Sequence, residues 1–133
     1  MAERPMEIVE RCELPNGLTV EFYDTSRRVA GDRWYVGLIT RIPVPVSRDA
    51  LLTLPEGPEL ADEFLEKTGG ILIFELKKER NFIDEREKVQ VFERIHSRLK
   101  AHVIDYLAHK DFAAGVIRRE FEEFRKRRLW WRE

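Results

Sequence analysis

The sequence predicts an α+β protein, because strand patterns fill its first part and helical patterns its last part. In the first third, apolar residues alternate with polar ones, which is the period of a half-buried strand. Asp84 followed by Glu87 predicts a helix N-cap, and beyond it apolar residues such as Ile95, Leu99 and Val103 recur at spacings of three and four, as in an amphipathic helix. We therefore expect a single domain over residues 1–133, with mainly strands and one short helix over 1–83 and helical structure over 84–132.

The expected sheet is antiparallel with about four strands, in the chain order βββαβαα, and the long C-terminal helical segment packs on one face of it. Its clearest part is a β-hairpin with strands over residues 6–13 and 18–23. Between them, Pro15 presets a turn, and Asn16 and Gly17 tolerate the left-handed backbone that a hairpin requires.

Two further strands and a short helix complete the sheet half. A strand over residues 33–42 is expected to end at Pro43 and Pro45, because proline has no N–H to donate to a neighbouring strand. A short helix within residues 58–70, with Pro58 in its first turn and Gly69 just beyond its end, precedes the strand over 71–76. That strand is apolar on nearly all positions, which predicts a central place in the sheet.

The helical half permits either one helix or two. Leu99 and Ile117 share one helical phase, so a single helix over 84–132 is possible. It would be about 70 Å long, whereas a domain of this size has a radius of gyration of about 14 Å. We therefore favour a break near Lys110 with Asp111 as a second N-cap. The uninterrupted helix would make dimerisation close to obligatory.

Composition favours a cytoplasmic protein without membrane contact. Charged residues make up 37% of the chain, and no apolar run approaches the roughly 20 residues that span a bilayer. The acidic N-terminal stretch does not resemble a signal peptide, and the single cysteine cannot form an intrachain disulfide. Net charge is −1, yet the second half is basic; we interpret this as two halves that touch and neutralise each other.

No motif specifies a chemistry, so the interpretation leans against an enzyme, and we expect no catalytic residue, cofactor or metal. His102, Asp105 and His109 are spaced like metal ligands, but seven helical residues rise about 10.5 Å, too far for one ion. Cys12 is expected to pack as a small apolar side chain. The glycines form neither a dinucleotide fingerprint nor a P-loop.

The stretch over residues 24–33 reads as a loop and is the best candidate for an anion site. Ser26, Arg27 and Arg28 follow one another there, and guanidinium groups bind phosphate or carboxylate in a bidentate manner. The alternative is a solvated turn. A small enzyme or ligand-binding domain with its anion site at this loop is one of the functions that we retain.

The C-terminal stretch "RREFEEFRKRRLWWRE" is the best candidate for an interface. Aromatic and arginine side chains are enriched at the centres of protein interfaces, and two tryptophans close to a helix end suggest that something covers them. The candidate interface residues are Phe121, Phe124, Arg125, Arg128, Trp130 and Trp131.

The leading functional hypothesis is a non-enzymatic module that uses this C-terminal helix to bind another protein or to self-associate, for example as a homodimer. Nucleic-acid binding through its basic residues is the alternative. Internal pairing of Glu and Arg or Lys along the helix, together with an overall pI of about 6.3, argues against nucleic acid.

Overall fold

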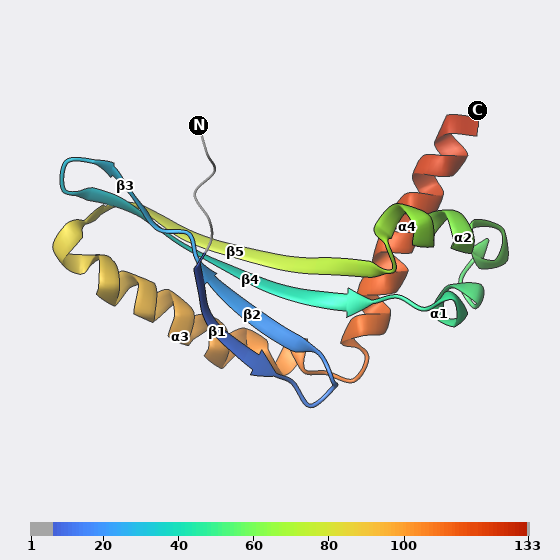
Figure 1. The fold of residues 1–133 in the computed structure, drawn as a ribbon, viewed down its shortest axis with the longest axis horizontal. Helices are drawn as coiled ribbons and strands as arrows, with labels where there is room; N and C mark the ends of the chain where they lie inside the picture. Colours follow the sequence, from blue (N-terminus) through green and yellow to red (C-terminus); the bar gives the residue numbers. More distant parts are fainter. Residues whose placement is uncertain (1–6, 133) are drawn as a thin grey trace. The chain divides into compact units, whose positions relative to one another are not determined.

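A computed structural model describes the backbone of residues 7–132 and the side chains of residues 7–130. Its antiparallel five-stranded sheet, its helices and its long last helix confirm the predicted α+β class (Figure 1). Relative to the expected order βββαβαα, the structure adds a short strand, a short helix and a 3₁₀ turn. In chain order the elements are β1 (Glu7–Glu13), β2 (Thr19–Asp24), β3 (Arg27–Ala30), β4 (Arg33–Pro45), α1 (Arg48–Leu52), α2 (Gly57–Thr68), β5 (Ile71–Asp84), η1 (Glu85–Glu87), α3 (Lys88–Leu107) and α4 (Phe112–Arg132).

The chain divides into two compact units. The first comprises residues 1–42 and 75–108, and the second comprises residues 43–74 and 109–133. Strands β4 and β5 each supply residues to both units. The single domain expected over residues 1–133 stays a prediction.

The predicted N-terminal hairpin is confirmed for the residues that the structure describes. Strand β1 pairs antiparallel with β2, and Cys12 lies opposite Val20. The turn is closed by the Leu14 N–H, which donates to the Leu18 carbonyl at 2.8 Å. Gly17 has a φ of +89°, which is the left-handed backbone predicted for this turn.

Much of the predicted loop over residues 24–33 is a strand. Strand β2 pairs antiparallel with β4, with Glu21 opposite Arg41, and β3 continues along the same edge with Arg27 opposite Tyr35. These two pairs have the same register, so β2 and β3 act as one long strand with a short interruption. The chain turns from β3 into β4 at Gly31, where φ is +56°.

Strand β4 runs three residues beyond the predicted end at residue 42: it passes through Pro43, and its last residue is Pro45. The Thr25 N–H donates to the Gly37 carbonyl at 3.0 Å, which means that odd-numbered residues of β4 turn their backbone polar groups toward β2 and β3. Pairing with β2 reaches only as far as Arg41. The prolines lie beyond that point on the same edge, and therefore their missing N–H costs no ladder bond.

Strand β5 pairs with the other edge of β4, and no described strand pairs with the outer edge of β5. The expectation that residues 71–76 form a central strand is therefore wrong. The central strand is β4, whose residues Val36, Leu38, Thr40 and Ile42 are completely buried. Within this apolar run, Leu72 is buried as expected, but Ile71 and Ile73 are about half exposed.

Two helices occupy the C-terminal half, as predicted, with residues 108–111 between them. The expected cap Asp84 accepts a hydrogen bond from the Arg86 N–H at 2.8 Å, but it begins the 3₁₀ turn η1, and α3 itself begins at Lys88. At the other end of α3, the Asn16 side chain donates to the Leu107 carbonyl at 2.8 Å. The hairpin turn thus satisfies a carbonyl that a helix end leaves without a partner.

Helix α3 packs on one face of the sheet in the first unit. Its residues Ile95 and Leu99 are buried, and the His96 ring meets the Phe22 ring of β2 edge-on at a centroid distance of 4.7 Å. The side chain of Lys100 reaches Glu10 of β1 at 2.9 Å. Together these contacts hold α3 over the β1 and β2 side of the sheet.

In the second unit, an aromatic cluster joins α2 to α4. Phe64 meets both Phe121 and Phe124 edge-on, each at a centroid distance of 5.2 Å. Helix α2 has proline in its first turn and ends at Thr68, and Gly69 caps it with a φ of +72°; the proline and the glycine were both expected from the sequence.

Gly37 of β4 is required by close packing. A Cβ at this position would lie 2.3 Å from Thr25 Oγ1 and 2.7 Å from the Tyr35 ring. The Tyr35 hydroxyl donates to Glu79 of β5 at 2.6 Å, so the ring is held in place over the glycine.

We expect Gly37→Ala to lower the free energy of unfolding by about 1–3 kcal/mol, because the added methyl group overpacks a rigid site. Chemical denaturation measures this. The matched control is Gly115→Ala in α4, where a Cβ meets nothing within 4 Å. Alanine there should stabilise the protein by about 0.5–1 kcal/mol. Equal effects of the two substitutions would contradict the packing argument.

Candidate functional site: a cationic groove between β5 and α3

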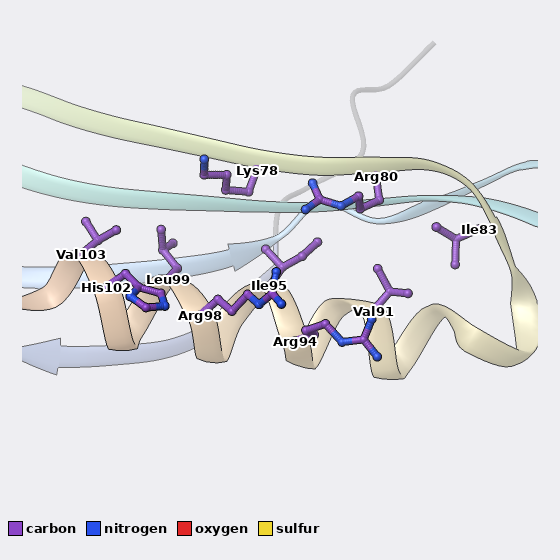
Figure 2. Close-up of a pocket in the computed structure, with 10 residues that line it drawn as sticks. All are labelled: Lys78, Arg80, Ile83, Val91, Arg94, Ile95, Arg98, Leu99, His102 and Val103. Carbon is purple, nitrogen blue, oxygen red and sulfur yellow. The ribbon is translucent and has the colours of Figure 1, made fainter.

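A pocket of about 590 Å³ lies between β5 and α3 in the first unit. Figure 2 shows Lys78, Arg80 and Ile83 on the side of β5 that faces α3. The opposite wall is one long face of the helix. The residues that line the pocket are Lys78, Arg80, Ile83, Val91, Arg94, Ile95, Arg98, Leu99, His102 and Val103.

The helical wall consists of two parallel rows at i, i+4 spacing. One row is aliphatic, namely Val91, Ile95, Leu99 and Val103, and the other is basic, namely Arg94, Arg98 and His102. Residues four apart lie above one another on the same helix face. From first to last, the aliphatic row spans about 18 Å. The groove therefore has an apolar floor with a basic rim along its length.

The two rims are cationic and the lining contains no carboxylate. Within the part of the chain that the structure describes, no ion pair involves Lys78, Arg94 or Arg98. The Arg80 guanidinium donates to the main-chain carbonyl of Glu79 at 2.9 Å. Arginine and lysine side chains collected on one concave surface without carboxylates attract an anionic ligand.

Phe82, next to the pocket residue Ile83, has an unusual backbone. Its φ is +56°, which is rare for a bulky residue other than glycine, and its side chain is 73% exposed. Among the described residues, no packing of this exposed ring compensates for the strain in its backbone. Such strain is concentrated at binding sites and active sites.

A second cluster brings Glu10 and Cys12 of β1 close to His96 and Lys100 of α3. Glu10 Oε2 lies 2.9 Å from Lys100 Nζ, and its Oε1 lies 2.9 Å from His96 Nε2. The hydrogen bond from Lys100 holds the pKa of Glu10 below its usual value. Burial, and then the neighbouring Glu10, raise the pKa of the Cys12 thiol. Cys12 thus stays protonated, so this cluster links strand to helix and does not supply a thiolate.

The three residues predicted to bind an anion have separate partners. The Ser26 hydroxyl accepts the Gly37 N–H at 3.2 Å, the Arg27 guanidinium stacks on the Tyr35 ring at 4.8 Å, and Arg28 pairs with Glu85 at 2.9 Å. Arg27 and Arg28 are neighbours in a strand, so their side chains point to opposite faces. The structure does not bring the three together, and an anion site there stays a prediction.

Most of the predicted C-terminal interface residues contact other residues of the second unit. Phe121 and Phe124 are buried against Phe64, while Arg125 pairs with Glu56 and Glu122, and Arg128 pairs with Glu63. Trp130 is 76% exposed. The Trp131 side chain lies outside the described residues. Binding of another chain at this helix end stays a prediction.

Two further findings bear on the class of protein. No helix formed by residues 7–132 is long and apolar enough to cross a membrane. Nor do the described side chains include a group of three or more His, Cys, Asp or Glu placed to hold a metal ion.

Comparisons with protein-family models, with curated proteins and with solved structures found no significant match to this chain. The site must therefore be interpreted from its own geometry.

The sequence interpretation missed the groove, although part of its signal was present. The aliphatic residues Ile95, Leu99 and Val103 were recognised as one helical stripe. Arg94 and Arg98 follow the same spacing one position earlier, but what they face depends on β5, which is distant in sequence. A helical pattern alone cannot show that a basic strand lies opposite.

We expect Phe82→Gly to raise the free energy of unfolding by about 1 kcal/mol, because glycine adopts a positive φ without strain. Phe82→Ala is the control, since alanine keeps the backbone strain and removes the same exposed ring. It should change stability little. Thermal or chemical denaturation distinguishes the two, and equal stabilities of the two variants would contradict strain at this position.

We expect Glu10→Gln to lower the free energy of unfolding by about 0.5–1 kcal/mol at neutral pH, because the pair with Lys100 is partly exposed. The pKa of Glu10 is lowered in the folded state, so its contribution exists above the unfolded value of 4.5 and disappears as pH falls through the folded value. Denaturation across this pH range measures the difference. A difference that persists in strong acid would contradict the assignment.

Proposed function

We propose that this protein is a non-enzymatic binding module whose β5–α3 groove holds an acidic segment of another protein. The observation that carries the proposal is the charge of the groove lining, in which lysine and arginine surround an aliphatic floor and no carboxylate is present. A segment with carboxylates at its sides and aliphatic side chains between them matches both features. Carboxylates form bidentate pairs with arginine, which favours such a ligand further.

The lining favours a polypeptide over a nucleic acid. Proteins that hold single-stranded nucleic acid stack its bases on aromatic side chains. No Phe, Tyr or Trp lines the groove, and its floor is the aliphatic row Val91, Ile95, Leu99 and Val103. The net charge of −1 also differs from the basic balance that is usual for nucleic-acid binding.

The two parts of the lining have different energetic roles. Burying the aliphatic floor contributes about 25 cal/mol per Å² of apolar surface removed from water. The rim charges remain solvated, so they contribute mainly to the rate of association and to the choice of partner. We therefore expect moderate affinity with a marked dependence on ionic strength.

The test uses a fluorescent peptide of about eight residues in which Glu and Val alternate, a length that covers the floor when extended. Fluorescence anisotropy should show binding at low ionic strength that weakens as salt is added. The double substitution Arg94→Glu and Arg98→Glu should reduce affinity about tenfold or more, because it reverses one rim.

The matched control is Lys126→Glu with Arg127→Glu, which changes net charge equally on exposed positions of α4. This variant should bind the peptide like the unmodified protein. If the two variants lose affinity for the peptide equally, the binding depends on overall charge and not on the groove, and the proposal is overturned. Tighter binding of a single-stranded oligonucleotide, lost in the groove variant alone, would assign the groove to nucleic acid instead.

The C-terminal helix is a separate candidate surface. The exposure of Trp130 supports a protein contact there, whether with a partner or with a second copy of this chain. It involves different residues from the groove, so the two contacts can be tested independently.

A further inference from the structure

We infer that the acidic segment binds as an amphipathic α-helix that lies beside α3 on the same face of the sheet, an inference that rests on the proposed function. The groove is lined by three rows of side chains, namely the cations of β5, the aliphatic floor and the basic row of α3. In Figure 2, Lys78 and Arg80 point from β5 toward α3. A matching ligand must present apolar groups with carboxylates on both sides of them, all in one direction.

An extended segment does not meet all three rows. Successive side chains of a strand point to opposite faces. If every second side chain of the ligand contacts the floor, the side chains between them point away from the groove. The set that faces the groove follows a single line, so it cannot reach the floor and the rims on both sides of it. An extended Glu–Val peptide therefore uses only part of the lining at any time.

An amphipathic helix has the required arrangement. Apolar residues at i, i+4, i+7 and i+11 form one stripe, and acidic residues on either side of the stripe flank it. With the stripe on the floor, one acidic flank lies toward Lys78 and Arg80, and the other lies toward Arg94 and Arg98. Amphipathic helices that place their apolar face in a groove are a recurrent form of peptide recognition.

The length of the groove suits a helix of three to four turns. The aliphatic row from Val91 to Val103 spans about 18 Å, which about twelve helical residues cover. A helix with its side chains is about 10 Å wide, so its body rests on the two rims and only its apolar stripe enters the pocket of about 590 Å³.

The first unit leaves a place for a second helix on this face of the sheet. Helix α3 is held on the β1 and β2 side, where Lys100 pairs with Glu10. Strands lie about 4.8 Å apart, so one helix covers about two of them. Lys78 and Arg80 are exposed on β5, and α3 is the only α-helix among the described residues of this unit.

The helices of the chain itself do not match the groove, so the partner is another protein and not a second copy. Among the described α-helices, only α2 carries more acidic than basic residues. Its apolar residues Leu60, Ala61 and Phe64 are buried, and Phe64 packs on Phe121 of its own unit. Helices α3 and α4 are basic, and the cationic rims repel them.

Two matched peptides of about fourteen residues test the inference. The first places leucine along the stripe, glutamate on both flanks and alanine on the outer face. The second has proline in place of the central outer alanine, which breaks the helix and leaves the charge unchanged. In fluorescence anisotropy, the first peptide should bind the full chain at least about tenfold more tightly than the second. Circular dichroism should show that the first peptide gains helix on binding.

The outcomes separate this inference from the proposed function. Equal affinities of the two peptides, or binding of the Glu–Val peptide alone, would overturn the helix while the proposed function stands. If none of the three peptides binds, the proposed function itself fails.

Neighbouring lysines of β5 provide a second test, because their side chains lie on opposite faces of the strand. Lys78 lines the groove, whereas Lys77 pairs with Glu79 at 3.5 Å on the face that carries Tyr35. Lys78→Glu should weaken binding of the helical peptide about tenfold, and Lys77→Glu, with the same change in charge, should leave it nearly unchanged. Equal effects in correctly folded variants would show that the β5 rim does not contact the ligand, against the inference.

Charge exchange between peptide and protein tests whether the two flanks face different rims. Two versions of the helical peptide carry lysine instead of glutamate on one flank or on the other. Only one version should bind more tightly than the original peptide to the variant with Lys78→Glu and Arg80→Glu, because only one flank faces β5. The version that does so reports the direction of the bound helix. The same response to both versions would contradict a helix seated between the rims.

Discussion

Strand β4 is hydrogen-bonded along both edges, and the first unit depends on this arrangement. One edge pairs with β2 and β3, and the other pairs with β5. On one face, Val36, Leu38 and Ile42 have no exposed surface. Because β4 takes the central position, β5 becomes an edge strand. The candidate site lies between this edge strand and α3.

The groove combines features that do not favour the folded state. Lys78, Arg80, Arg94 and Arg98 gather around one cavity without a carboxylate among the lining residues, and Phe82 adopts a backbone conformation that is costly for an aromatic residue. Elsewhere in the described chain, arginines such as Arg125 have carboxylate partners. Local departures from stable packing are expected where a protein binds a ligand.

The hairpin, the break before α4 and the α+β class could be predicted because their signals are local. Pro15, Asn16 and Gly17 determine a turn, and the spacing of apolar residues distinguishes strand from helix. The candidate site could not be predicted in the same way. Its two walls are β5 and α3, and neither the edge position of β5 nor the face that α3 turns toward it is written in a local pattern.

The sequence by itself determined the α+β class, the hairpin turn, and the proline and glycine at the two ends of α2, because each of these signals depends on neighbours within a few positions. The tertiary structure alone decided which strand is central, why Pro43 and Pro45 are tolerated, and which cations share a groove. These properties depend on pairing between distant segments. An apolar run such as residues 71–76 reports burial of its side chains, but the pairing of its backbone is settled only when the other strands take their places.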